Sequence, residues 1–206
     1  MEIRIGTSGW SYPGWRPRFY PVGLKPGEFL GYYASRFPTV ELNTTAYRLP
    51  AAEQFARWAD AVPEGFRFAP KLALARPERV GLYLERVASL GHALGPIRVV
   101  VQHARNDALI EELRAAPVEL AFDFRHDSWR GVEGLVTVND FDAEPFRYIR
   151  LREPPYTGEE LEDLAARLRP PAYVYFRHED EPTAPAYAER LAAMVMVRGG
   201  RLNPGR

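Results

Sequence analysis

Two short segments of this chain carry ionisable side chains at the point where a predicted strand ends. The first is Val-Glu-Leu-Asn-Thr-Thr at residues 40–45, and the second is Asp-Phe-Arg-His-Asp-Ser-Trp at residues 123–129. Each begins with the alternation of apolar and polar residues that is typical of a strand. Burying polar side chains without partners is costly, so a group of them at strand ends indicates a functional site. Carboxylates such as Glu41 and Asp123 could perform general acid–base chemistry there.

The alternation of side chains along a strand predicts which of them face the interior of a barrel. Val40 and Leu42 share the apolar face that should meet helices, which leaves Glu41 and Asn43 pointing inward. The same reasoning places further polar residues inward at the carboxyl ends of other strands, and these are Lys71, Gln102, Asp123, Arg125, Arg150, Arg152 and Arg177. The excess of positive charge in this set favours an anionic ligand, such as a phosphate or a carboxylate.

We assign catalytic roles to Glu41 and Asp123 as acid–base groups, to Lys71 as the cation that tunes them, and to His126. The substrate-binding candidates are the other inward polar residues and the polar or aromatic residues of the adjoining loops. They are Trp10, Tyr12, Asn43, Thr44, Tyr47, Arg48, Gln102, Arg125, Trp129, Arg150, Arg152 and Arg177. The aromatic members could stack on a sugar or a base.

A purely structural interpretation of these charges is the alternative. Pairs such as Asp123–Arg125 and Glu41–Lys71 could simply fill a barrel interior. We expect a mostly buried network that joins at least two of these four residues, so that Arg125→Ala would cost ~3–5 kcal/mol of stability. Arg98 shares the inward parity but lies near a strand start, and we expect it to extend out of the opposite end, as do Arg4 and Arg67.

Metal and nucleophile chemistry have weaker support in the sequence. Glu41, Asp123, His126 and Asp140 could converge as an oxygen-rich site with one imidazole, but the cations among them argue against a cation cage. The chain has no cysteine, and Ser8 and Ser128 lie in no nucleophile elbow. We therefore expect no metal and no cofactor.

Short apolar segments rich in Val, Ile, Phe and Tyr alternate with helical patterns along the chain. The predicted strands are Glu2–Gly6, Thr39–Asn43, Phe66–Lys71, Ile97–Gln102, Glu119–Phe124, Leu135–Asn139, Phe146–Leu151 and Ala172–Phe176. The predicted helices are Pro26–Phe37, Ala51–Ala61, Arg76–Leu94, Asp107–Ala115, Glu159–Leu168 and Ala184–Val197.

This alternation predicts an α/β fold, a compact (β/α)8 TIM-type barrel with reduced helices around the sixth strand. An open doubly wound sheet is the alternative, although no glycine-rich dinucleotide turn follows a strand. We expect residues 1–198 to form a single barrel domain and residues 199–206, which begin with Gly199 and Gly200, to form a flexible tail.

The charge balance limits the partners. The chain has 27 Lys and Arg against 27 Asp and Glu, which argues against a strongly basic nucleic-acid protein and against a membrane-surface protein. No apolar run approaches the ~18–20 residues of a membrane helix, and strand-like sequence follows Met1 without a signal segment. We expect a cytoplasmic monomer whose partner is a small anionic molecule. Nucleic acid is a less favoured partner, and no membrane partner is expected.

Several of these motifs resemble the YecE-like family, catalogued as domain of unknown function 72. The resemblance rests on Gly-Thr-Ser-Gly-Trp-Ser-Tyr-Pro-Gly-Trp at residues 6–15, on residues 40–50 and on Phe-Arg-His-Asp-Ser-Trp at residues 124–129. It extends over essentially the whole chain and implies a TIM barrel, but it supplies no reaction. The chain departs from the family in carrying Asp123 in place of a usual glutamate, Arg152 in place of a histidine, and Arg177-His178 in place of an Asn-Asn pair.

Together these observations predict an enzyme of the hydrolase or lyase type, independent of metal, acting on a small anionic or phosphorylated polar substrate at the carboxyl mouth of the barrel. The alternative, which stays open, is a nucleic-acid-binding or repair-type barrel without small-molecule catalysis.

Overall fold

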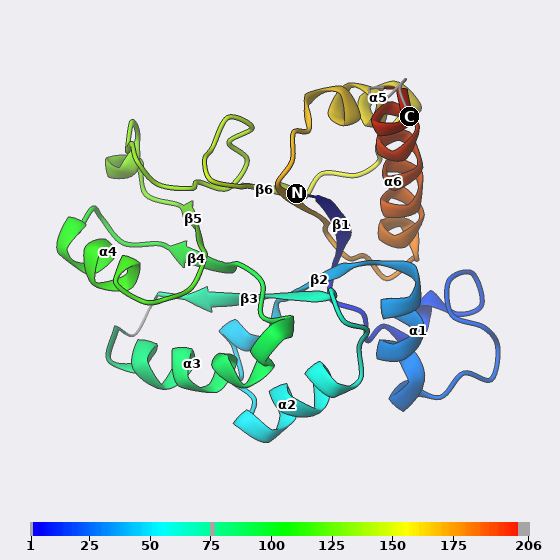
Figure 1. The fold of residues 1–206 in the computed structure, drawn as a ribbon, viewed down its shortest axis with the longest axis horizontal. Coiled ribbons are helices and arrows are strands. Elements are labelled where there is room, and N and C mark those ends of the chain that lie inside the picture. Colours follow the sequence, from blue (N-terminus) through cyan, green and yellow to red (C-terminus); the bar gives the residue numbers. More distant parts are fainter. Residues whose placement is uncertain (1, 75–76, 202–206) are drawn as a thin grey trace.

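Seven parallel strands form a nearly closed barrel in the computed structural model, which describes residues 2–74 and 77–201 (Figure 1). The strands are β1 (Ile3–Ser8), β2 (Thr39–Leu42), β3 (Arg67–Ala73), β4 (Ile97–Val101), β5 (Leu120–Phe124), β6 (Arg147–Leu151) and β7 (Ala172–Phe176). Their order around the sheet is β5-β4-β3-β2-β1-β7-β6. The predicted TIM-like α/β barrel is confirmed, and the open doubly wound alternative is not.

The gap between β5 and β6 is spanned by the segment predicted as the sixth strand, Leu135–Asn139. That prediction is wrong for a continuous strand, because the segment makes only single bridges, from Thr137 to Phe122 and from Val138 to Tyr148. Asn139 has a φ of 71° and cannot continue an extended strand. Backbone hydrogen bonds still join this segment to the strands on its two sides. The Phe122 N–H of β5 donates to the Val136 carbonyl (2.8 Å), and the Asn139 N–H donates to the Tyr148 carbonyl of β6 (2.9 Å).

Helices cover most of the outer surface of the barrel (Figure 1). They are α1 (Phe29–Arg36), α2 (Ala52–Asp60), α3 (Val80–Val87), α4 (Asp107–Arg114), α5 (Gly158–Arg167) and α6 (Thr183–Arg201). Short 3-10 turns accompany them: η1 (Pro13–Trp15), η2 (Pro26–Glu28), η3 (Thr44–Ala46), η4 (Pro77–Arg79), η5 (Ala88–Ala93) and η6 (Asp127–Trp129). Between β5 and β6 the described chain has η6 and loops but no α-helix, which confirms the reduced helices expected there.

Two predicted helices differ in extent from the observed ones. The long helix predicted from Arg76 to Leu94 is divided into α3 and two 3-10 turns, since Gly91 adopts a φ of 52°; Arg76 itself lies outside the described residues. Helix α6 extends to Arg201, and its last residues fall in the segment predicted as a tail from residue 199. Residues 202–206 lie outside the described part of the chain.

The barrel has an outer and an inner core. Outward strand residues such as Val40, Val99 and Val174 pack against the helices, in one large cluster. A second, smaller cluster fills the interior with alanines and tyrosines, and its buried members are Ala69, Ala121, Val136, Ala143, Phe146, Tyr148 and Tyr175. The small side chains on β3 and β5 leave interior space toward the carboxyl ends of the strands for longer polar side chains.

The hydroxyl of Tyr33 connects β1 to β2 at Thr39, the first residue of β2. Tyr33 accepts a hydrogen bond from the Thr7 N–H (2.8 Å) and donates to the Thr39 carbonyl (3.1 Å). The two strands approach so closely that a Cβ at Gly6 would lie 2.1 Å from the Thr39 oxygen. This arrangement brings Ser8 into register with Glu41 at the carboxyl end of the pair.

Candidate functional site

A buried network of charged side chains occupies the barrel interior toward the carboxyl ends of the strands. At its centre lies Glu41 on β2, which is 0% exposed. Its Oε1 accepts hydrogen bonds from the Tyr148 hydroxyl (2.9 Å) and from Arg98 Nη1 (3.1 Å), and its Oε2 accepts one from Arg150 Nε (2.7 Å). Both oxygens of this carboxylate are therefore occupied within the protein.

Asp123 on β5 is the second carboxylate of the network, and three arginines converge on its Oδ2. Arg98 donates to it from Nη2 (2.6 Å) and Nε (2.9 Å). Arg125 donates from Nη2 (2.9 Å), and so does Arg152 (2.6 Å). The predicted network that joins Asp123 to Arg125 is confirmed. Glu41 is joined to arginines rather than to Lys71.

Arg98 on β4 links the two carboxylates, and the expectation that it leaves through the opposite end is wrong. Its side chain is 3% exposed and contacts both Glu41 and Asp123. Arg98 lies beside Ala121 in the β4–β5 register, and Asp123 is the next inward residue along β5. Same-face residues on a strand lie ~6.5–7 Å apart, a distance that an arginine side chain can span. The alternation of side chains along β4, which directs Arg98 inward, was the sequence signal that could have predicted its place in the network.

The other two arginines of that group do lie at the amino ends of the strands. Arg4 donates from Nη1 to the Gly65 carbonyl (2.6 Å) and pairs with Glu2 at 3.0 Å. Arg67 donates to the Phe66 carbonyl (2.9 Å).

The electrostatics of the network favour a further negative charge. Four guanidinium groups, those of Arg98, Arg125, Arg150 and Arg152, face two carboxylates. Burial raises the pKa of Glu41, but the charges of Arg150 and Arg98 and hydrogen bonds from Arg150 and Tyr148 outweigh it and lower the pKa to about 2. Burial lowers the pKa of Arg152, and the neighbouring arginines add to this effect while Asp123 opposes it. The enclosed Arg98 and Arg150 are balanced by the two carboxylates, so the excess positive charge lies on the more exposed Arg125 and Arg152.

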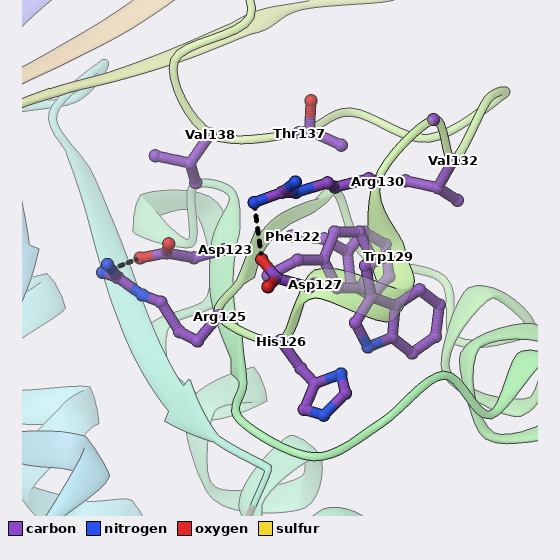
Figure 2. Close-up of a pocket in the computed structure, with 12 residues that line it drawn as sticks. Phe122, Asp123, Arg125, His126, Asp127, Trp129, Arg130, Val132, Thr137 and Val138 are labelled. Atoms are coloured by element: carbon purple, nitrogen blue, oxygen red, sulfur yellow. Dashed lines mark hydrogen bonds and ion pairs between the residues drawn. The ribbon is translucent and has the colours of Figure 1, made fainter.

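A cavity of about 370 Å³ opens beside this network, and Asp123 and Arg125 contribute to its wall. Figure 2 shows the Asp123–Arg125 pair near a second ion pair, in which Arg130 contacts Asp127 at 2.9 Å. His126 also lines the cavity, but its ring is directed away from Asp123 (Figure 2). Its Nδ1 accepts the Ser128 N–H (3.2 Å), and the residue is exposed. His126 is therefore close to the cavity but separate from the buried network.

The remaining predicted residues divide into those near the network and those apart from it. Arg150 is buried, and Arg152 is partly buried with 25% of its side chain exposed. Lys71 places its Nζ 5.0 Å from the centre of the Tyr47 ring, and that ring is 85% exposed. Trp10, Tyr12 and Asn43 are half-buried, and the exposed members are Thr44, Arg48, Gln102 and Arg177.

Trp129, which is predicted to bind substrate, lines the same cavity but is almost fully enclosed. The residue is 3% exposed, its ring stacks on Phe124 at 4.3 Å, and its Nε1 donates to the His103 carbonyl (3.0 Å). Phe124 faces outward from the barrel with the large outer core. The indole is thus covered on the outer side of β5 and offers no free face for stacking at the barrel mouth.

His178, which sequence reasoning leaves out of the predicted site, lies beside the network. Its Nδ1 is 3.2 Å from the Ser8 Oγ, which also accepts the His178 backbone N–H (2.9 Å), and Tyr12 stacks on its ring at 4.6 Å. Burial lowers the pKa of His178, and the charges of Arg150 and Arg177 lower it further. The imidazole is thus neutral at pH 7. Its position after the last strand was the signal available in the sequence.

Across residues 2–74 and 77–201, no three His, Cys, Asp or Glu side chains are grouped so that they could hold a metal ion. In the same residues, no helix combines the length and the apolar character needed to cross a bilayer.

The fold and the site together define a TIM-like α/β barrel with a charged network at the carboxyl ends of its strands. The family model described as "Protein of unknown function DUF72" matches residues 4–141. The chain belongs to this family, which confirms the resemblance seen in its motifs.

Curated relatives and solved structures agree with this assignment. The chain is 39% identical over 66 residues to the UPF0759 protein YecE of Escherichia coli K12, which is 32% of this chain and 22% of that protein. It is 35% identical over 69 residues to the UPF0759 protein YunF of Bacillus subtilis, which is 34% of this chain and 23% of that protein. Each match thus spans less than a quarter of the relative.

A crystal structure of a DUF72 family protein from Enterococcus faecalis V583 has a TM-score of 0.72 at 19% identity, covering 95% of this chain and 96% of that one. A second structure of that protein has a TM-score of 0.68 at 18% identity, covering 96% and 97% of the two chains. At this level of identity the similarity shows a shared fold.

Proposed function

We propose that this protein binds a small anionic or phosphorylated polar molecule at the carboxyl mouth of its barrel and acts on it as a hydrolase or lyase without a metal. One observation supports the proposal above all others. Four arginines are gathered on two carboxylates, so the network carries more positive than negative charge. The surplus lies on Arg125 and Arg152, whose side chains are 42% and 25% exposed and so can meet a ligand, and arginine is well suited to phosphate and carboxylate groups.

The four arginines divide into a framework and a binding pair in this proposal. Arg98 and Arg150 are buried and held by Glu41, so they form the framework. Arg125 and Arg152 have 42% and 25% of their side chains exposed, and each is held at Asp123 by one N–H. A guanidinium has five N–H donors, so both retain donors for a ligand. The Arg152 Nε is buried and has no hydrogen-bond partner among the described residues.

The two carboxylates also differ in what they can do. Glu41 has both oxygens occupied and a pKa of about 2, so in this proposal it positions Arg98 and Arg150 and does not exchange protons. The described hydrogen bonds of Asp123 all end on Oδ2, and the residue lines the cavity. We therefore assign the acid–base role to Asp123 through its Oδ1.

A thermal-shift screen with phosphorylated and carboxylated metabolites tests the binding proposal. A ligand at ~100 times its Kd stabilises the folded state by ~2.7 kcal/mol, which such a screen detects readily. Arg125→Gln should weaken the binding of any hit by about tenfold or more, equivalent to ~1.4 kcal/mol. Arg130→Gln is the matched control, because Arg130 lines the same cavity but, among the residues that the structure describes, forms its ion pair with exposed Asp127 and not with Asp123. Equal binding by wild type and Arg125→Gln would contradict the proposal.

The catalytic assignment is tested separately with whichever metabolite binds. Asp123→Asn should bind it and turn it over far more slowly, since an amide cannot act as the base. Full turnover by this variant would show that another group is responsible. If no metabolite binds but oligonucleotides do, with a steep dependence on salt concentration, the nucleic-acid alternative would be favoured instead.

A further inference from the structure

A groove of about 820 Å³ lies between α1 and α2, outside the network described above. These helices are neighbours on one side of the barrel (Figure 1). The groove wall is completed by the loop that follows β1 and by the loop that follows β2, at the carboxyl ends of these strands. Its volume lies within the ~300–1,000 Å³ that is typical of small-molecule sites.

Aromatic and aliphatic side chains form much of the groove wall. Trp10 is half-buried and is held edge-to-face against Trp58 at 5.2 Å and against Phe68 at 6.1 Å. Leu30 and Leu42 add aliphatic surface. The groove also has polar groups, those of Ser11, Tyr12, Glu28, Asn43, Thr44, Gln54 and Arg57. An apolar wall with a few polar groups is the usual lining of a site for a ring that is itself partly polar.

The groove approaches the charged network at Tyr12. Asn43 lines the groove directly after β2 ends at Leu42, and its φ of −69° and ψ of −32° show that the backbone has left the extended conformation there. Tyr12 also lines it and donates to the carbonyl of Ser8, the residue paired with Glu41 across β1 and β2. Burial raises the pKa of Tyr12 to about 12, with Glu41 adding to the effect and Arg150 opposing it, so its phenol lies within electrostatic range of the network.

We propose that this groove binds a flat aromatic or heterocyclic ring belonging to the molecule whose anionic group is held by the arginines. The ligand class is thus an aryl or nucleoside phosphate rather than a simple sugar phosphate. The inference rests on the proposed function, and it adds the identity of the second half of the ligand. The supporting observations are the indole of Trp10, the size of the groove, and the position of Tyr12, which lines the groove, donates to the Ser8 carbonyl and stacks on His178 beside the network.

Calorimetric titration with three probes tests this inference. The probes are inorganic phosphate, ribose 5-phosphate and adenosine 5′-monophosphate, which share the anion and differ in the ring. Adenosine 5′-monophosphate should bind at least about tenfold more tightly than ribose 5-phosphate, because stacking on the groove wall adds to the binding of the phosphate.

A blocking variant shows whether the preference arises in the groove. Gly31 on α1 lines the groove, and a Cβ placed there would meet nothing within 4 Å, so Gly31→Leu fills space without removing a contact. This variant should bind inorganic phosphate as wild type does but lose the preference for adenosine 5′-monophosphate. Gly81→Leu is the matched control, since Gly81 on α3 has equally open surroundings and is outside the groove.

A second variant removes the proposed stacking surface itself. Trp10→Ala should lose the preference and Trp10→Phe should retain most of it, provided that both melt cooperatively. Equal affinities for adenosine 5′-monophosphate and ribose 5-phosphate, or an unchanged preference in Gly31→Leu, would overturn the groove inference and leave the anion site standing. Binding of adenosine as tightly as its monophosphate would overturn the link between groove and arginines. Failure of all three probes would overturn the groove inference, whereas the anion site is decided separately by the thermal-shift screen of phosphorylated and carboxylated metabolites.

Discussion

Replacing Arg98 with methionine removes a side chain that connects Glu41 to Asp123. Arg98 is 3% exposed and makes an ion pair with each carboxylate, at 3.1 Å to Glu41 and 2.6 Å to Asp123. Methionine has a similar length and an apolar character, so the substitution removes charge and hydrogen bonds with little change in volume. Both carboxylates then remain in the interior with fewer partners.

The expected loss of stability follows from the burial of these groups. Removing one partner of a buried ion pair costs ~3–5 kcal/mol, because the other charge is left uncompensated. Glu41 would keep Arg150 and Tyr148, and Asp123 would keep its two other arginines, so we expect a value near ~3 kcal/mol. For a chain of this length, that loss corresponds to a decrease of roughly 6–12 °C in Tm.

Urea unfolding followed by circular dichroism measures this loss, with Arg114→Met as the control. Arg114 pairs with Glu111 on α4 at 3.0 Å, and their side chains are 47% and 68% exposed. An exposed pair of this kind contributes ~0.3–0.5 kcal/mol. If Arg98→Met unfolds within ~1 kcal/mol of Arg114→Met, the network is more solvated than its geometry indicates, and the reasoning that places a preorganised charged site in the barrel would be refuted.

Three further predictions concern the same core and its supports. The pKa of Glu41 falls from 4.5 to about 2 on folding, so its carboxylate contributes ~3 kcal/mol to the free energy of unfolding. This contribution is fully present above pH 4.5 and is lost as the pH falls through about 2. Acid unfolding curves should show the loss, and an identical curve for Glu41→Gln would contradict it. Gly6→Ala should destabilise by ~1–3 kcal/mol or more in thermal melts, since its Cβ would meet the Thr39 oxygen, whereas Gly81→Ala should not destabilise. Thr157→Ala should cost ~1 kcal/mol in urea unfolding, because the Thr157 side chain and Glu160 cap the first turn of α5; a Thr157→Ser variant that loses as much would argue against the cap.

The stability role predicted for Arg125 illustrates how the structure changes an estimate made from the sequence. Parity along β5 correctly indicates that Arg125 contacts Asp123. Its side chain is 42% exposed, however, so its removal should cost only ~0–1 kcal/mol. We expect the larger loss of stability on removal of Arg98, because Arg98 pairs with Asp123 from a buried position.

Much of the fold could be predicted from local pattern. Seven of the eight predicted strands are present within two residues of their predicted bounds, because short apolar runs bounded by turn residues favour strands in any context. The exception, Leu135–Asn139, has the same apolar alternation, but the left-handed conformation of Asn139 limits it to single bridges. Nothing in its composition distinguishes it from its neighbours.

The sequence by itself determined the alternation of strands and helices, the end of the barrel at which Glu41 and Asp123 lie, and the surplus of arginine around them, since each depends on residue type and local parity. Only the tertiary structure decided which cation pairs with which carboxylate. Arg98 reaches Glu41 and Asp123 because the register of β4 and β5 sets it beside Ala121, one inward level below Asp123, and because the alanines of the inner core leave it room. Such pairings depend on strand register and interior volume, which are properties of distant segments brought together and cannot be read from any one of them.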